Sequence, residues 1–223
     1  LLCTTNFSFL KGASHPEELV GRADDLGYRV ALVLPPFYYK PMSDAGLIAW
    51  YTALHEALGE RRIVIYFYNF PQMTGLKIPP AVIAALHEAA PERFGGIKDS
   101  SGDLDYARAV LAAAPGLAVF PSSETVLAQA AADGFAGCIS ATLNFTCERA
   151  ARIWADPPPA DHPDCAALAA ERAAAAGPDL IPGIKHVVSV RTGDPRWRNL
   201  VPPFLPLSEA AGADLVARLD AIG

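Results

Sequence analysis

Short apolar runs alternate along this chain with longer alanine-rich stretches, and this alternation constrains the fold more than any other feature. The runs are rich in β-branched and aromatic residues, as buried strands are. They cover residues 30–36, 62–70, 94–100, 117–122 and 136–142. The alanine-rich stretches have helical periodicity, and several begin at Ser or Asp, where a helix N-cap belongs. Helices are therefore predicted over residues 15–27, 43–58, 79–90, 103–114 and 123–134.

Strands that alternate with helices through short loops predict βαβ units and a parallel sheet, either doubly wound or closed into a (β/α)8 TIM barrel. The sequence has no G-x-G-x-x-G word after its first strand and no G-x-x-x-x-G-K-[ST] phosphate loop, which argues against a nucleotide-binding doubly wound domain. A barrel carries its functional side chains at the carboxyl ends of its strands. The polar residues found there are Tyr68, Asn69, Lys98, Asp99, Ser122, Ser140 and Asn144. We therefore predict an α/β fold of the barrel type.

The strand pattern ends after residue 143, and only helical patterns follow. They cover residues 147–155, 164–176, 183–190 and 208–222. We therefore expect the (β/α) barrel to occupy residues 1–145 and a C-terminal helical appendix, packed on the barrel, to occupy residues 146–223.

The composition is that of an ordinary globular chain, with 223 residues, 52% of them hydrophobic and 19% charged. A net charge of −6 and the lack of a basic stripe argue against nucleic acid as the main partner. No apolar run reaches the roughly 20 residues that cross a bilayer, and the first residues do not resemble a signal peptide. The four cysteines form no C-x-x-C pair. We therefore expect a cytoplasmic protein with reduced thiols and a small-molecule substrate.

The stretch "FGGIKDSSGD" (94–103) brings Lys98 to the end of a predicted buried strand. Burial lowers the pKa of a lysine amine, and a neutral amine attacks carbonyl carbons to form a Schiff base. Tyr68 ends the preceding strand, and a phenol beside the amine can carry the protons that this chemistry requires. The residues alone also allow a lysine whose amine reaches solvent and a tyrosine that caps the core.

The words around these two residues resemble a known family. "YNFPQMTG" (68–75) and "GGIKDSSGD" (95–103) match the words Y-N-x-P-x-x-[ST]-G and G-x-K-x-[ST]-[ST]-G-D of the pyruvate-dependent class I aldolases. That family includes dihydrodipicolinate synthase and N-acetylneuraminate lyase. "GCISATLNF" (137–145) resembles its eighth-strand word, and the resemblance runs in order from about residue 11 to residue 208. It implies a (β/α)8 barrel, a homotetramer, and a lyase or aldolase that needs no metal or organic cofactor.

The resemblance also assigns roles to particular residues. Lys98 would form the Schiff base with a 2-keto acid, as with pyruvate, and Tyr68 would shuttle protons. "LVLPPFYYKP" (32–41) resembles the fourth-strand word, and its Tyr38 would match a tyrosine that reaches across a dimer interface toward the neighbour's site. The expected reaction is aldol addition of pyruvate to an aldehyde, or its reverse.

Further residues of the expected site follow the fifth strand and the eighth. Gly137 and Ile139 would line the pocket, and Ser140 and Asn144 are candidates for contact with substrate hydroxyls. Where the synthase branch has an arginine for the carboxylate of the aldehyde, this chain has Met73, and a thioether cannot make that bidentate contact. The chain is therefore expected to be nearer the members that cleave 2-keto-3-deoxy sugar acids.

One family word, G-T-T-G-E at the end of the second strand, has no counterpart in this sequence. Residues 3–7 resemble the family's first strand, and residues 11–14 resemble the end of its third. Only three residues separate Phe7 from Lys11, which is too few for the crossover that joins two parallel strands. We therefore expect that a segment with the second strand and its flanking helices is missing from the sequence near residues 9–11. The alternative is a degenerate barrel that binds a keto acid, or assembles, without turnover. Among enzymes, a keto-acid dehydratase and dihydrodipicolinate synthase itself also stay open.

Overall fold

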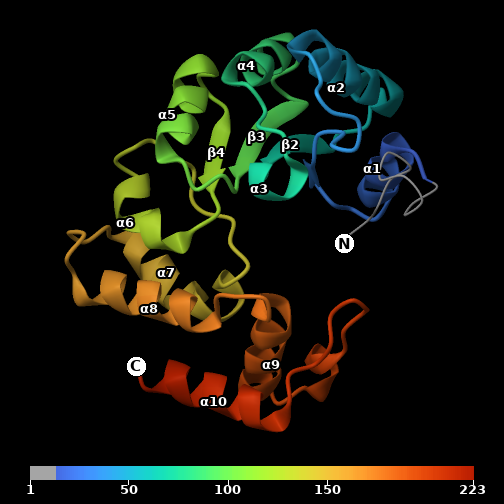
Figure 1. Ribbon diagram of the computed structural model, residues 1–223. Coiled ribbons are helices and arrows are strands. Elements are labelled where there is room, and N and C mark those ends of the chain that lie inside the picture. The colour runs from blue at the N-terminus through green and yellow to red at the C-terminus, as the bar shows by residue number, and fades with distance from the viewer. Residues whose placement is uncertain (1–13) are drawn as a thin grey trace. The chain divides into compact units, whose positions relative to one another are not determined.

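The computed structural model describes residues 14–223 of the chain (Figure 1). They divide into two compact units. The first, here called the sheet unit, runs to Ser122 and also contains Asp133–Ala136. The second, here called the helical unit, contains Ser123–Ala132 and Gly137–Gly223. The predicted missing segment near residues 9–11 lies outside the described residues, and the predicted domain boundary at residue 145 stays a prediction.

The sheet unit is built on four parallel strands that neighbour one another in chain order. They are β1 (Val30–Val33), β2 (Val64–Asn69), β3 (Phe94–Asp99) and β4 (Ala118–Pro121). A doubly wound sheet reverses its strand order at a switch point, whereas a barrel wall keeps the order of the chain. The described part of the sheet therefore has the topology that was predicted for a barrel.

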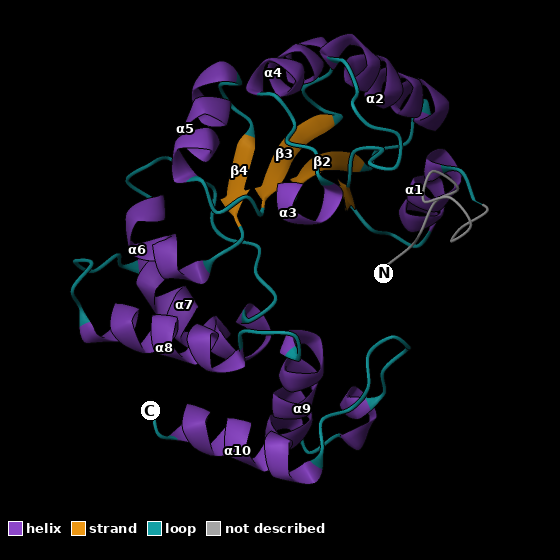
Figure 2. Ribbon diagram, in the orientation of Figure 1, coloured by secondary structure: helices purple, strands orange, loops and turns teal. Residues whose placement is uncertain are grey.

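Helices of the sheet unit lie at positions that the sequence predicts, namely α1 (Pro16–Asp25), α2 (Asp44–Leu58), α4 (Pro80–Ala89) and α5 (Leu104–Ala113). The single turn α3 (Pro71–Thr74) was not predicted. Local signals explain where the helices begin, since Ser43 and Asp103 are N-caps whose side chains accept hydrogen bonds from backbone N–H groups. Figure 2 shows α2, α4 and α5 on one side of the orange strands.

The strands bury one face against these helices. Along β2, Ile65 and Phe67 are fully buried, whereas Tyr66 and Tyr68 between and after them are half-buried. Since successive side chains of a strand point to opposite faces, the two tyrosines lie on the face away from the helices. The ring of Phe67 stacks on that of Phe94, with 5.5 Å between their centroids. This packing fixes β2 against β3 and therefore fixes the register of the side chains at their ends.

The helical unit contains the remaining elements. They are η2 (Glu124–Val126), α6 (Leu127–Ala130), α7 (Leu143–Ala155), α8 (Pro163–Ala175), α9 (Leu180–Thr192), η3 (Pro195–Arg198) and α10 (Glu209–Asp220). Apolar faces of α7, α8, α9 and α10 pack together in one buried cluster, which consists of Phe145, Ala175, Ile184, Val187, Leu215 and Leu219. In the described part of the chain, no helix combines the length and the apolar character that a bilayer-crossing helix needs.

Two sequence predictions of secondary structure were wrong. Residues 136–142 form no strand, because pairing beside β4 stops after the hydrogen bond from the Ala136 N–H to the Val119 carbonyl (2.9 Å). The next residue, Gly137, has a φ of 138°, which turns the chain out of the ladder and into the helical unit. The helix predicted over 123–134 is also shorter, since only η2 and α6 form there.

Candidate active site

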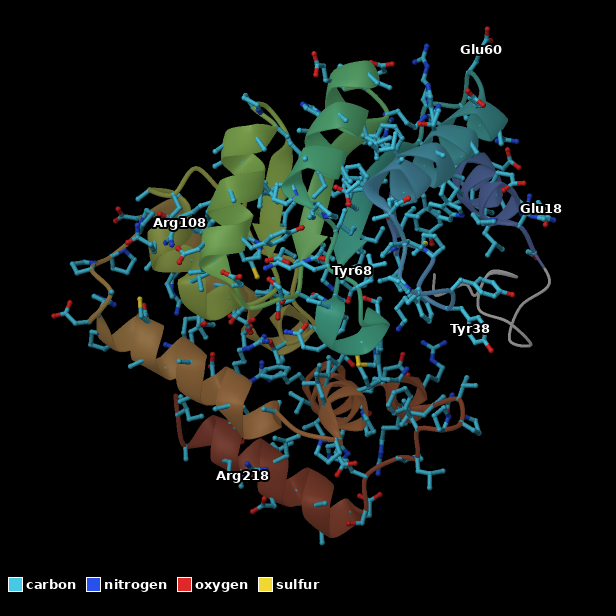
Figure 3. The ribbon with its side chains drawn as sticks, turned by 45° about the horizontal axis from the view of Figure 1, so that its top comes forward. Glu18, Tyr38, Glu60, Tyr68, Arg108 and Arg218 are labelled. Carbon is cyan, nitrogen blue, oxygen red and sulfur yellow. The ribbon has the colours of Figure 1, made fainter. Side chains whose placement is uncertain are left out.

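Lys98 and Tyr68 lie side by side at the carboxyl ends of β3 and β2. They are direct partners in the parallel register. The Lys98 Nζ donates a hydrogen bond to the Tyr68 hydroxyl at 3.1 Å, and it lies 4.3 Å from the centroid of the tyrosine ring. Both residues are half-buried, so the amine is partly accessible to solvent. Tyr68 is labelled in Figure 3. The contact of the amine with the phenol is the one that the sequence predicted for a catalytic pair.

A layer of small and aromatic residues supports this pair from below. Tyr66 lies two residues before Tyr68 on the same face, and its ring stacks on that of Phe120 at 5.6 Å. The ring passes over Gly96, where a Cβ atom would come within 2.9 Å of the Tyr66 ring and 2.8 Å of the Ala118 carbonyl oxygen. A glycine is therefore required at this position, two residues before Lys98, because any side chain there would collide with the Tyr66 ring and the Ala118 carbonyl.

A buried polar pair lies behind the lysine and the tyrosine. Asn69 and Asp99 are the next register partners, and the Asn69 Nδ2 donates to the Asp99 Oδ1 at 2.7 Å. The Asn69 Oδ1 accepts from the Ile78 N–H at 3.0 Å, and the Asp99 Oδ2 accepts from the Ser101 hydroxyl at 2.8 Å. The pair therefore holds the loops that follow β2 and β3.

Replacing Asn69 by alanine is expected to destabilise the sheet unit by about 2–3 kcal/mol, because it removes one hydrogen bond from the buried Asp99 carboxylate and leaves the Ile78 N–H without a partner. The free energy of unfolding from urea titration measures this. Ser100→Ala, a half-buried change in the same loop, is the control and should cost less than about 1 kcal/mol. Equal effects of the two variants would contradict the role of the pair.

The loop after β2 is closed by Thr74 and Gly75. The Thr74 hydroxyl donates to the Phe70 carbonyl at 2.9 Å, and Gly75 ends α3 with a left-handed φ of 66°. Met73 is 73% exposed on this turn. Tyr38, on the loop after β1, is 50% exposed and packs edge to face on the Tyr39 ring at 5.2 Å. The structure therefore places both predicted residues on exposed loops of the sheet unit, and their roles stay predictions.

The other predicted site residues belong to the helical unit, and their roles also stay predictions. Gly137 is buried and Ile139 is half-buried. The Ser140 hydroxyl lies 2.9 Å from the Thr142 hydroxyl and accepts from the Arg172 Nη1 at 2.8 Å. Asn144 is in the first turn of α7, where its Nδ2 donates to the Ala141 carbonyl at 2.8 Å.

Glu124, which accepts hydrogen bonds from Thr142 and Arg172, was not among the site residues predicted from the sequence. Its carboxylate is fully buried and accepts hydrogen bonds from the hydroxyls of Thr142 and Thr146 and from Arg172 at 2.8 Å. Burial acts to raise the pKa of Glu124, but hydrogen bonds from Ser140 and Thr142, with the charge of Arg172, outweigh burial and hold it below its usual value. The sequence offered one signal for it, an acidic residue two positions after the predicted strand over residues 117–122.

Glu124 should make the stability of the helical unit depend on pH. Its pKa is lowered from 4.5 by folding, so the ionised carboxylate stabilises the fold above that value and less as the pH falls through the folded value. Glu124→Gln is expected to cost about 2 kcal/mol at neutral pH and clearly less near pH 3, measured by urea unfolding at both pH values. A cost that does not change with pH would show that the charge has no part in it.

Comparison with known proteins agrees with this fold. The model of the dihydrodipicolinate synthetase family matches residues 14–220. An uncharacterized DapA-like lyase of Chloroflexus aurantiacus is 33% identical over 207 residues, which cover 90% of this chain and 67% of the relative. For three 4-hydroxy-tetrahydrodipicolinate synthases, from Cellvibrio japonicus, Rhodospirillum centenum and Ruegeria pomeroyi, the share of the relative's length that is covered is 40% to 58%.

Two solved structures are similar over 92% of this chain and 70% of their own. Dihydrodipicolinate synthase from Agrobacterium tumefaciens has a TM-score of 0.80 at 27% identity. YagE, a prophage protein of the dihydrodipicolinic acid synthase family from E. coli K12 in complex with pyruvate, has a TM-score of 0.79 at 25% identity.

A parallel sheet in chain order, with a lysine and a tyrosine paired at its carboxyl edge, defines the chain as part of a (β/α) barrel of the TIM class. The match over residues 14–220 identifies it further: the chain belongs to the dihydrodipicolinate synthetase family. The family resemblance drawn from the two sequence words is thereby confirmed.

Proposed function

We propose that this protein is a Schiff-base-forming lyase or aldolase that acts on a 2-keto acid. The observation that carries the proposal is the 3.1 Å contact between the Lys98 amine and the Tyr68 hydroxyl at the carboxyl edge of the sheet. An amine beside a phenol combines a nucleophile for the keto carbon with a group that moves protons. Membership of a family whose matched relatives include a lyase and several synthases supports the same chemistry.

The reaction begins when the Lys98 Nζ attacks the C2 carbonyl carbon of the keto acid. One proton of the amine and one proton from solvent pass through Tyr68 to the carbonyl oxygen, which leaves as water, and a protonated imine remains. In the cleavage direction the C3–C4 bond breaks, and its electron pair moves into the imine to form an enamine. The C4 hydroxyl loses its proton through Tyr68, so the aldehyde leaves, and C3 is protonated before water releases pyruvate. The imine is the electron sink, so the proposed steps use no metal or organic cofactor.

The substrate is proposed to be a 2-keto-3-deoxy acid rather than the substrates of a synthase. The exposed thioether of Met73 supports this choice, because it supplies no charge for a second carboxylate. Gly137, Ile139, Ser140 and Asn144 are proposed to take part in binding the substrate. Donors for the pyruvate carboxylate are expected from the segment predicted to be missing. A cytoplasmic homotetramer, in which Tyr38 reaches a neighbouring site, is the proposed working form.

Reductive trapping tests the proposal directly. The full natural protein is incubated with pyruvate and sodium borohydride, and its intact mass is then measured. A single pyruvyl adduct that peptide mapping places on Lys98 is the expected result. Absence of an adduct at saturating pyruvate would favour a barrel that assembles without forming an imine.

A further inference from the structure

The proposed reacting pair, Lys98 and Tyr68, lies where β2 and β3 leave the sheet. A single register position, Asn69 opposite Asp99, follows it. Just beyond, the Ser100 N–H donates to the Asn69 carbonyl at 2.8 Å. Structure opens most easily where such hydrogen bonding ends. The 3.1 Å contact between the amine and the phenol therefore depends on what holds the two strand ends together.

The hydrogen bond between the side chains of Asn69 and Asp99, here called the strand-end link, connects these ends. The exposed fractions of the two residues are 0% and 3%, and 2.7 Å separates the Asn69 Nδ2 from the Asp99 Oδ1. Successive side chains of a strand alternate between faces, so the link lies on the face of the sheet opposite to Lys98 and Tyr68. It therefore crosses between the strands one residue beyond the reacting pair.

Further hydrogen bonds hold both members of the strand-end link in place. The Asp99 carboxylate also accepts from the Ser101 N–H at 3.1 Å and from the Ser101 hydroxyl at 2.8 Å. The Asn69 Oδ1 accepts from the Ile78 N–H at 3.0 Å. Gln72 adds a second crossing, since its Nε2 donates to the Ser101 carbonyl at 2.6 Å. Asn69 and Asp99 therefore cannot turn without losing several hydrogen bonds.

Stability alone does not explain a polar pair at this buried place. Two apolar side chains of similar shape can often replace a buried polar pair with little or no loss of stability. Hydrogen bonds differ from apolar contacts because they fix both a distance and a direction. The benefit specific to Asn69 and Asp99 is therefore a fixed geometry of the two strand ends.

We propose that Asn69 and Asp99 are positioning residues, which hold the Lys98 amine and the Tyr68 hydroxyl at the distance that proton transfer requires. This inference rests on the proposed function and adds two residues to its machinery. They act through the ends of β2 and β3 and not by contact with the keto acid. A misplacement of about 1 Å can cost about 100-fold in rate, so loss of the link should slow imine formation more than it weakens binding.

Two substitutions at residue 99 test the proposal. Asp99→Ala removes the strand-end link, whereas Asp99→Asn keeps an Oδ1 acceptor for the Asn69 amide and the Ser101 N–H. Imine formation at saturating pyruvate is stopped with borohydride at increasing times, and the rate constant is taken from the enzyme that finally forms the adduct. We expect Asp99→Ala to lower it about 10–100-fold, with KM for pyruvate changed less than about 3-fold, and Asp99→Asn to stay within about 3-fold of the wild type.

This measurement separates positioning from stability. A residue that only stabilises the fold changes the share of enzyme that forms the adduct, but not the rate constant of that share. Asn69→Ala breaks the link from the other side and gives the same test if Asp99→Ala does not fold. Ser100→Ala, in the same loop, should keep the wild-type rate constant. A wild-type rate constant without the link, or equal losses in Asp99→Ala and Asp99→Asn, would overturn the proposal.

Acetylation of lysines without any keto acid gives an independent readout. The rate at Lys98, mapped by peptide mass, is divided by the rate at Lys185 on α9 as an internal reference. This ratio should change by more than about 3-fold in Asp99→Ala and stay near the wild-type value in Asp99→Asn, because the reactivity of an amine follows its surroundings. If the wild type forms no pyruvyl adduct, the proposed function fails, whereas an unchanged ratio in Asp99→Ala overturns the positioning role.

Discussion

Replacing Lys98 by alanine is expected to abolish the pyruvyl adduct and to lower kcat/KM by on the order of 10⁴-fold or more. The Lys98 amine is the atom that bonds to the keto acid, and the hydroxyl of Tyr68 cannot take its place as an imine former. Intact mass after borohydride trapping and steady-state cleavage of a 2-keto-3-deoxy acid measure the two effects. The variant should fold, because Lys98 is half-buried and makes no ion pair within the described chain.

Lys77→Ala is the matched control, because it removes an amine at the same edge of the sheet that is paired with Asp103. It should form the adduct as the wild type does. An adduct that persists in Lys98→Ala and disappears in Lys77→Ala would identify Lys77 as the nucleophile in place of Lys98.

Replacing Tyr68 by phenylalanine is expected to lower kcat by about 10²–10⁴-fold while leaving Lys98 able to form the adduct slowly. The change removes only the hydroxyl that accepts from the Lys98 Nζ and keeps the ring that stacks on Phe70. The rate of imine formation, followed by quenched-flow trapping, should fall together with kcat.

Tyr66→Phe provides the comparison for Tyr68→Phe. Tyr66 lies on the same face of β2, two residues earlier, and its ring stacks on Phe120. Loss of its hydroxyl should change kcat by less than about 3-fold, since the hydroxyl is one layer below the reacting amine. If the two variants lose the same activity, Tyr68 acts through packing and not as a proton carrier.

The fold was predictable as far as local patterns reach. The runs that became β1 to β4 and the capped helices between them were found because burial and capping depend on neighbouring residues. The predicted strand at 136–142 failed because an apolar run does not reveal whether a partner strand continues beside it. The helix predicted from residue 147 begins at Leu143, since its first turn carries polar residues that hide the period.

The candidate site was predictable in part. Lys98 and Tyr68 could be found because each is a polar residue at the end of an apolar run, within a word that resembles a family. The contacts of Glu124 could not, because its partners come from residues 142, 146 and 172 and no local period connects them. The hydrogen bond from the Lys40 Nζ to the Thr74 carbonyl could not be predicted either, since 34 positions separate the two residues.

The sequence by itself therefore determined the order of strands and helices, the N-caps at Ser43 and Asp103, and the identity of the two residues expected to do chemistry. Only the tertiary structure decided that Lys98 and Tyr68 are 3.1 Å apart and that Lys77 is paired with Asp103. The physical reason is range. Propensity, periodicity and capping act over a few residues, whereas register and long-range ion pairs depend on how separate segments pack.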